Sequence, residues 1–555
     1  MYDLSKIEQN FPFDEFREGQ KECIEAVLNA FSNGKRFVIL EAPTGSGKSV
    51  IGMTIAKFFQ RSYYLTIQKI LQDQLVKDFE SKDVKCLKGR NAYPCNYWDI
   101  YKDKFKDDPA KMKAMAQMSR DPAVGHTMKG RRLPASEGVC LVKDRRSKSD
   151  LCFPYGTGNL AKSTCPYWSA VGEAVQSSTC IMNFHSFLYQ TQVEERFKPR
   201  DLIIIDEGHN TEPQLMDFVS LTLTDKAWRK EGIKMPKYDT AEEYAEWFDE
   251  IKVHERIEDI IRLANLTRDF KKANDWKKVL LQYSIFLQSV ASGDWIPKWE
   301  NKGPWNKVTL KPVFVDKHAD KYLFNHGKKV LIMSATILLP KVMYESLGID
   351  PSEAFAYRMK NRFPIENRPI YFQPAGSMSY KNKQRTMPKL LEATEEIAKT
   401  YKNEKGIIHT HNFEIAKYML EKGSRSLKKR LVFQENYMSK DDMLKDHAQR
   451  TDGPIIIAPA MHEGLDLKGD LSRFQIICKI PYPSFVENEQ LKLRMQLSQD
   501  YYNWLTALKL IQSYGRSIRS KDDWADTFVL DEDFGFFQKK CQKLLPTWFK
   551  SAIQR

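Results

Sequence analysis

The sequence predicts an α/β protein built on parallel β-sheets. Short runs of apolar, β-branched residues recur along the chain, each followed by a turn and a helical pattern, at residues 37–40, 202–205, 330–333 and 455–457. Strands that are apolar throughout are typically buried on both faces, as in parallel sheets covered by helices. Polar residues follow the runs, at the carboxyl ends where such sheets bind ligands.

Length and charge narrow the class of protein. A chain of 555 residues predicts three or four domains of about 100–200 residues each. The 87 Lys and Arg residues exceed the 72 Asp and Glu residues, and the net charge is +15. This excess favours an anionic partner such as nucleic acid or an anionic membrane, and a generic basic protein is the alternative.

The distribution of apolar residues and cysteines predicts a cytoplasmic protein. No apolar run approaches the roughly 18–20 residues that a membrane span needs, and the first residues lack a signal-peptide pattern. Thiols stay reduced in the cytoplasm, where clustered cysteines favour a metal site over disulfides. Six of the nine cysteines are clustered in this way, namely Cys86, Cys95, Cys140, Cys152, Cys165 and Cys180.

A phosphate-binding loop follows the first apolar run. Its residues are Ala42, Pro43, Thr44, Gly45, Ser46, Gly47, Lys48 and Ser49. Glycines let backbone N–H groups turn inward around phosphates, helped by the N-terminus of the next helix. Lys48 can reach the β- and γ-phosphates, and Ser49 can hold Mg²⁺. Ala42 stands where the general pattern begins with Gly.

Two acidic residues, Asp206 and Glu207, follow the run at 202–205. Asp206 is expected to hold Mg²⁺, directly or through water. Glu207 is placed to orient and deprotonate an attacking water. Acidic residues after a strand are often only a solvated turn, but their pairing with the phosphate loop favours nucleotide hydrolysis.

These motifs, taken in order, resemble those of superfamily 2 helicases, and among them the XPD/DinG-like group with a DEAH-type box. The resemblance covers nearly the whole chain. Its motifs are Arg17-Glu18-Gly19-Gln20, the phosphate loop, Leu65-Thr66-Ile67-Gln68-Lys69 (motif Ia), Asp206-Glu207-Gly208-His209 (motif II), Ser334-Ala335-Thr336 (motif III), His462-Glu463-Gly464-Leu465-Asp466 (motif V) and Gln512-Ser513-Tyr514-Gly515-Arg516-Ser517-Ile518-Arg519 (motif VI). Gly208 stands where Ala is usual.

The resemblance implies two RecA-like lobes with ATP·Mg²⁺ between them. Arg17 and Gln20 would read the adenine, and Asp466 and Gln512 would complete the nucleotide site. Arg516 and Arg519 would reach across from the second lobe, where arginine stabilises charge on the transferring phosphoryl group. Lys48, Asp206, Glu207, Arg516 and Arg519 are therefore the expected catalytic residues.

The resemblance also implies the substrate. It predicts 5′-to-3′ movement on single-stranded DNA and separation of duplex or fork DNA. Two alternatives remain: a translocase that displaces protein or RNA without unwinding duplexes, and a non-catalytic nucleic-acid scaffold. The intact phosphate loop and acidic pair argue against the scaffold.

The cysteine cluster lies between motifs Ia and II, where members of this group carry a [4Fe–4S] domain. The resemblance assigns Cys95, Cys140, Cys152 and Cys165 as ligands. Four thiolates can also hold Zn²⁺, and a site without metal is the third reading, since the chain has no Cys-x-x-Cys pair. Cys86 and Cys180 are spare candidates. The remaining cysteines are expected to be small core residues, namely Cys23, Cys478 and Cys541.

Together these features divide the chain into expected domains. The first lobe is expected at residues 1–85, 182–214 and 311–345, the second lobe at 346–555, an Fe–S-type insertion at 86–181 and a helical Arch-like insertion at 215–310. The last interval reads as long amphipathic helices. The basic stretch at 101–150 would suit a wedge at a DNA fork or, alternatively, a solvated loop.

Overall fold

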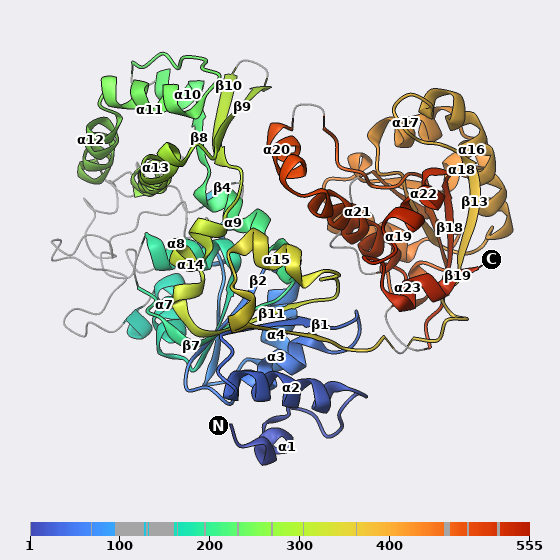
Figure 1. Ribbon diagram of the computed structural model, residues 1–555, viewed down its shortest axis with the longest axis horizontal. Helices are drawn as coiled ribbons and strands as arrows, with labels where there is room; N and C mark the ends of the chain where they lie inside the picture. The colour runs from blue at the N-terminus through green and yellow to red at the C-terminus, as the bar shows by residue number, and fades with distance from the viewer. Residues whose placement is uncertain are drawn as a thin grey trace.

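The computed structural model has two α/β lobes, each built on a seven-stranded sheet, and a smaller insertion above the first lobe (Figure 1). It describes residues 2–67, 69–94, 127–128, 131–132, 160–163, 165–193, 196–229, 232–267, 270–302, 305–361, 363–459, 467–485, 488–518 and 522–554. The predicted α/β class with two RecA-like lobes is confirmed.

The first lobe contains a parallel sheet in the order β12-β1-β11-β7-β2-β6-β3. Its strands are β1 (Phe37–Glu41), β2 (Ser62–Thr66), β3 (Val84–Leu87), β6 (Thr179–Asn183), β7 (Arg200–Ile205), β11 (Gly327–Ser334) and β12 (Ala354–Arg358). The strands predicted at 37–40, 202–205 and 330–333 are confirmed. β12 follows residue 345, where the first lobe was expected to end, so this lobe takes a strand from beyond that boundary.

Both faces of the first sheet are buried. Along β7, Ile203 and Ile205 face one core, while Leu202 and Ile204 face the other. This alternation explains why the strand reads as a continuous apolar run. The covering helices are α1 (Ile7–Asn10), α2 (Gln20–Ser32), α3 (Lys48–Ala56), α4 (Lys69–Phe79), α7 (Pro166–Gln176), α8 (Phe184–Gln192), α9 (Thr211–Val219), α14 (Asp316–Tyr322) and α15 (Pro340–Leu347).

The insertion combines helices with a small antiparallel sheet, where helices alone were expected. Its elements are β8 (Leu221–Thr224), α10 (Asp225–Arg229), α11 (Ala241–Glu250), α12 (Val253–Leu266), α13 (Phe270–Ser289), β9 (Trp295–Lys302) and β10 (Trp305–Pro312). The sheet order is β8-β10-β9, with Leu223 paired to Val308. β8 and β10 are far apart in sequence, so their pairing depends on tertiary packing.

The second lobe contains a parallel sheet in the order β15-β16-β14-β17-β18-β13-β19. Its strands are β13 (Ile370–Gly376), β14 (Gly406–His409), β15 (Leu431–Phe433), β16 (Ile455–Ala458), β17 (Phe474–Ile477), β18 (Asp526–Asp531) and β19 (Ile553–Gln554). β16 confirms the strand predicted at 455–457. The helices are α16 (Lys383–Thr400), α17 (Phe413–Lys422), α18 (Arg425–Arg430), α19 (Lys440–Gln449), α20 (Glu489–Leu497), α21 (Gln499–Tyr514), α22 (Asp533–Lys540) and α23 (Thr547–Ala552).

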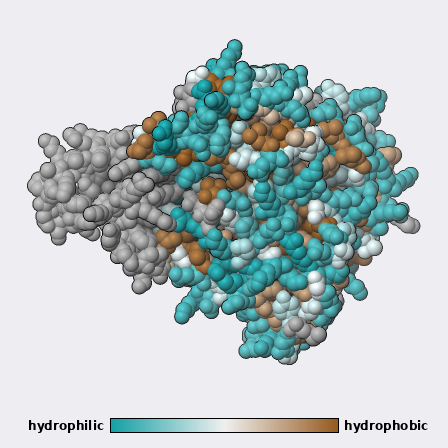
Figure 2. All heavy atoms as spheres, turned by 60° about the vertical axis from the view of Figure 1, so that its left-hand side comes forward, coloured by the Kyte–Doolittle hydropathy of each residue, from teal (hydrophilic) through white to brown (hydrophobic). Residues whose placement is uncertain are grey.

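One face of the molecule is mainly hydrophilic. Figure 2 shows a face on which hydrophilic residues dominate and hydrophobic residues form small, separate groups. Within the described ranges, no helix combines the length and apolar character needed to cross a membrane. In the cysteine-rich interval, the two-residue strands β4 (Thr127–Met128) and β5 (Arg131–Arg132) pair with each other.

Candidate active site

The phosphate loop connects β1 to α3, which begins at Lys48. Gly45 and Gly47 both have a φ of 79°, a left-handed conformation that favours glycine. A Cβ atom at Gly47 would lie 2.4 Å from Nε2 of Gln20. The backbone angle therefore favours glycine at position 47, and a larger residue would also displace the amide group of Gln20.

Arg17 and Gln20 hold the backbone of this loop in place. Nε2 of Gln20 donates to the carbonyl of Ser46 at 2.8 Å, and Nη1 of Arg17 donates to the carbonyl of Gly45 at 2.6 Å. The backbone N–H of Arg17 in turn donates to Oε1 of Gln20 at 2.8 Å. The two expected adenine readers thus contact the phosphate loop directly.

The loop also contains a polar atom whose bonding is incomplete. Oγ of Ser46 is buried and has no hydrogen-bond partner within the described part of the chain. A buried hydroxyl without a partner is costly. A phosphate oxygen bound in the loop can supply the missing bond, so the residues present fit a nucleotide.

Asp206 lies at the carboxyl end of β7 and close to the loop. Its Oδ2 accepts a 2.8 Å hydrogen bond from the hydroxyl of Tyr64, which also interacts with Ser49. Burial, reinforced by the neighbouring Glu207, raises the pKa of Asp206 to about 6, although the positive charge of Lys48 opposes this. Sequence reasoning placed each expected Mg²⁺ ligand but missed Tyr64, which joins them.

Glu207 has a strained backbone. Its φ of 52° is left-handed, a conformation that costs a non-glycine residue about 1–2 kcal/mol. Its Oε2 lies 3.5 Å from Nδ1 of His209. Strain of this kind gathers at functional sites.

The glycine in motif II has a steric explanation. A Cβ atom at Gly208 would lie 2.2 Å from Cγ2 of Ile332, a buried residue of β11. The alanine that is usual at this position therefore has no room here.

His209 connects three of the motifs. Its Nδ1 lies 2.7 Å from Oγ of Ser334 in motif III, and its Nε2 lies 2.7 Å from Nε2 of Gln512 in motif VI. An amide nitrogen can only donate, so the ring Nε2 accepts and the proton resides on Nδ1. Gln512 also approaches Oγ1 of Thr336 at 3.4 Å. Sequence reasoning quoted these residues but did not bring them together.

The second lobe supplies the remaining expected residues. Nε of Arg516 donates to the carbonyl of Gln512 at 3.1 Å, just beyond the end of α21. Arg519 and Asp466 lie outside the described residues. A cavity of about 260 Å³ separates α21 from the segment after motif II and is lined by Asn210, Trp504 and Lys509 among others.

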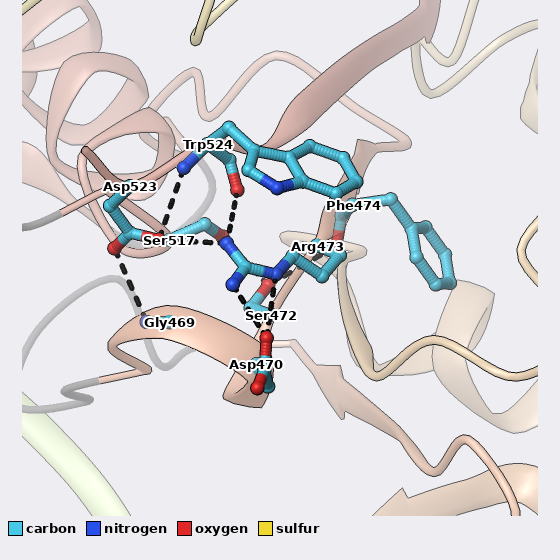
Figure 3. Close-up of polar contacts among 8 residues, drawn as sticks. All are labelled: Gly469, Asp470, Ser472, Arg473, Phe474, Ser517, Asp523 and Trp524. Carbon is cyan, nitrogen blue, oxygen red and sulfur yellow. Dashed lines mark hydrogen bonds and ion pairs between the residues drawn. The ribbon is translucent and has the colours of Figure 1, made fainter.

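A partly buried polar cluster holds the segments that follow motifs V and VI (Figure 3). Nη1 of Arg473 donates to Oδ1 of Asp523 at 2.9 Å, and Oδ2 of Asp523 accepts from the backbone N–H of Gly469 at 3.2 Å. The hydroxyls of Ser472 and Ser517, both fully buried, lie 2.7 Å apart. Ser517 follows Arg516 directly, so this cluster limits where Arg516 can lie. No sequence pattern pointed to it.

The cysteines fall into two groups. Cys165 lies at the N-cap of α7, while Cys95, Cys140 and Cys152 lie outside the described residues. The spare candidates are strand residues of the first sheet. Cys180 is buried and Cys86 is partly buried, and burial raises the pKa of Cys86 to about 12 and that of Cys180 to about 11. As expected for small core residues, three cysteines are buried, namely Cys23, Cys478 and Cys541.

Among the described residues, no group of three or more His, Cys, Asp or Glu could hold a metal ion.

Comparisons with known proteins agree with this arrangement. Residues 395–552 match the family model of the helicase C-terminal domain, and residues 14–235 match the res subunit of type III restriction enzymes. The chain is 27% identical over 115 residues to the ATP-dependent DNA helicase CHL1 of Candida albicans, covering 18% of this chain and 13% of that protein. It is also 27% identical over 112 residues to chl1 of Schizosaccharomyces pombe, with the same coverage. The chain therefore spans less than a fifth of the length of these relatives.

Solved structures resemble the whole chain. An XPD helicase structure matches with a TM-score of 0.59 and 16% identity, covering 96% of this chain and 99% of the other. The S. tokodaii Xpd4 structure matches with a TM-score of 0.51 and 13% identity, covering 97% and 99%. At this identity the likeness concerns the fold.

The two lobes, the phosphate loop and the motif contacts define a protein of the superfamily 2 helicase class. Both family matches fall on these lobes. Within that class the chain is similar over a short stretch to the CHL1 helicases, and its fold is similar to that of XPD helicases.

Proposed function

We propose that this protein is an ATP-dependent helicase that moves 5′ to 3′ on single-stranded DNA and unwinds duplexes. One observation carries the proposal: His209, two residues after Glu207, contacts Gln512 of the opposite lobe. A residue of motif II is thereby joined to the lobe that must move. The curated relatives named ATP-dependent DNA helicases support the choice of substrate.

ATP would bind at the phosphate loop. Backbone N–H groups of the loop from Thr44 to Ser49 would surround the phosphates, and Lys48 would contact the β- and γ-phosphates. Ser49 and Asp206, joined through Tyr64, would hold Mg²⁺. Bound Mg²⁺ would neutralise charge on the phosphate oxygens. The unsatisfied hydroxyl of Ser46 supports this placement.

Hydrolysis would use one residue as base and two as cations. The Glu207 carboxylate would accept a proton from the attacking water. Arg516 and Arg519 would stabilise negative charge on the transferring phosphoryl group. Arg17, Gln20, Ala42, Asp466 and Gln512 would complete the nucleotide site.

DNA binding would be mainly electrostatic. The net charge of +15 suits the phosphate backbone of single-stranded and fork DNA. We expect affinity to fall steeply with salt and to depend little on base sequence.

A [4Fe–4S] cluster on Cys95, Cys140, Cys152 and Cys165 would hold the cysteine-rich insertion in shape, with Zn²⁺ as the alternative. Support comes from Cys165, the N-cap residue of α7. Tyr167 and Trp168 of that helix pack into the core of the first lobe. A ligand at this position would be anchored on a rigid element. Hydrolysis of ATP needs no redox step, so the role would be structural.

Strand displacement on 5′- and 3′-tailed duplexes, with DNA and RNA versions of each strand, tests the proposal. We expect ATP-dependent displacement from 5′-tailed DNA only. Hydrolysis and protein displacement without strand separation would identify a translocase. Absence of DNA-stimulated hydrolysis would reject both motors in favour of a scaffold.

A further inference from the structure

Arg494 lies at a junction of three parts of the molecule. It belongs to α20, which reaches from the second lobe toward β10 of the insertion (Figure 1). Its side chain is 3% exposed. A buried guanidinium is costly unless its partners are well placed, so its contacts are informative.

The first set of contacts is with α9, the helix that follows motif II. Arg494 forms an ion pair with Glu212, which is 8% exposed. The hydroxyl of Tyr501, on α21, donates to Oε2 of Glu212 at 3.4 Å, and Arg494 lies 4.8 Å from the Tyr501 ring centre. The second lobe therefore holds the motif II helix through a buried charge.

The second set is with the base of the insertion, where β10 ends at Pro312. Nε of Arg494 donates to the carbonyl of Val313 at 2.6 Å, and the guanidinium lies 5.0 Å from the ring centre of Phe314. One turn earlier in α20, Nε2 of Gln490 donates to the carbonyl of Pro312 at 2.9 Å. Lys311 donates to Oε1 of the same glutamine at 2.8 Å.

These contacts bond one helix of the second lobe to the end of β10, through Gln490, and to the residues that connect β10 with the first lobe, through Arg494. If the lobes shift while α20 keeps its partners, the base of the insertion must follow the second lobe. If α20 releases its partners, the ion pair between Arg494 and Glu212 breaks. Each buried charge is then left unpaired, which costs considerable free energy.

We propose that Arg494 is a positioning residue that fastens the insertion to the second lobe, so that nucleotide-driven lobe movement is passed to the insertion. The inference rests on the proposed function, because it needs lobes that respond to ATP. It goes further by naming the contact that transmits the movement.

Distances between site-specific fluorescent labels test it in the full-length protein. One label pair joins the insertion to the second lobe, at Glu258 and Lys422, and another joins the two lobes, at Lys77 and Lys422. In the wild-type protein, a non-hydrolysable ATP analogue with single-stranded DNA should change the lobe-to-lobe distance and leave the insertion-to-lobe distance unchanged. In the Glu212→Gln/Arg494→Gln double variant, the insertion-to-lobe distance should change as well.

The double variant removes both charges, which avoids leaving one buried alone. Arg450→Gln is the matched control, because Arg450 bonds to Asp452 and to the carbonyl of Lys429 within the second lobe. We also expect the double variant to unwind fewer base pairs per ATP by about threefold or more, the size typical of residues that couple distant sites. Its KM for ATP should match that of the control.

Two outcomes would overturn the inference. The first is an insertion-to-lobe distance that responds identically in wild-type and double variant. The second is a double variant with a lower melting temperature but wild-type unwinding per ATP, which would mean a purely structural contact. A wild-type lobe-to-lobe distance that ignores nucleotide would instead reject the proposed function, and the inference with it.

Discussion

Nε2 of His209 and Nε2 of Gln512 lie 2.7 Å apart, although the two residues come from opposite lobes. The ring accepts this bond while its Nδ1 faces Ser334. Glu207, the proposed base, lies two positions before His209. A shift of α21 can therefore change the position of Glu207 through His209, without direct contact between Gln512 and the Glu207 carboxylate. Coupling between the lobes requires a contact that can be either formed or broken, and the contact between His209 and Gln512 is of this kind.

The His209–Gln512 contact should couple the lobes. We expect His209→Ala and Gln512→Ala each to lower DNA-stimulated kcat, and the double variant to be little worse than either. The coupling free energy should be about 1 kcal/mol, the usual size of one hydrogen bond. A double-mutant cycle measures it, with Gln499→Ala at the exposed start of α21 as control. Strictly additive effects would show that the two residues act separately.

The acidic residue after Asp206 should be needed for hydrolysis but not for ATP binding. We expect Glu207→Gln to lower kcat by about two orders of magnitude or more, a typical loss for a positioned base. Lys48→Ala should weaken nucleotide binding as well. Turnover and nucleotide titrations measure the two effects, and Asp201→Asn, at the other end of β7, is the control. Near-normal turnover in Glu207→Gln would remove this residue from the mechanism.

Gly208 should not tolerate the alanine of related motifs. We expect Gly208→Ala to reduce the free energy of unfolding by about 1–3 kcal/mol, because the new methyl overlaps Cγ2 of Ile332. Ile332→Leu moves the branch away from Cβ, so the double variant should lose less than the sum of the single changes. Denaturant unfolding provides the measurement. A fully stable Gly208→Ala protein would contradict the packing described for β11.

His447 should make the second lobe sensitive to acid. Burial lowers its pKa to about 4, and its ring Nε2 bonds to the carbonyl of Leu471 at 2.8 Å. Between pH 6.5 and pH 4, His447 is protonated in the unfolded chain but stays neutral in the folded chain. The free energy of unfolding therefore falls as the pH drops from 6.5 to 4. The difference corresponds to about 3 kcal/mol.

His447→Gln keeps a donor for Leu471 but cannot titrate, so it should flatten this part of the pH dependence. Melting temperatures between pH 7 and pH 4 measure the effect. His254→Gln on the exposed face of α12 serves as control. Parallel curves for wild-type and His447→Gln would show that other groups dominate acid unfolding.

The cysteine-rich insertion should hold iron. Anaerobically purified protein should be brown, with about four irons per chain. Cys140→Ser should abolish or weaken unwinding while leaving some DNA-stimulated hydrolysis, because the residues proposed for hydrolysis belong to the two lobes. Cys86→Ala should keep the iron. Colourless protein with one zinc would indicate a Cys₄ zinc site, and metal-free protein with full unwinding would leave these cysteines without a metal role.

Local patterns in the sequence determined four of the strands, the phosphate loop and the position of Asp206-Glu207. The reason is physical: a strand buried on both faces must be apolar throughout, and a loop around phosphates needs glycines at left-handed positions. The apolar strands and the glycine-containing loop each depend on residues that are neighbours in the sequence.

Tertiary structure alone decided which distant residues meet. Arg17 and Gln20 brace the phosphate loop, Ile332 fills the space beside Gly208, and His209 reaches Gln512. β8 pairs with β10 across the helices of the insertion, and Arg494 lies buried against Glu212. These contacts join residues tens to hundreds of positions apart, and their geometry follows from how whole helices and sheets pack. No local period or turn signal records such packing.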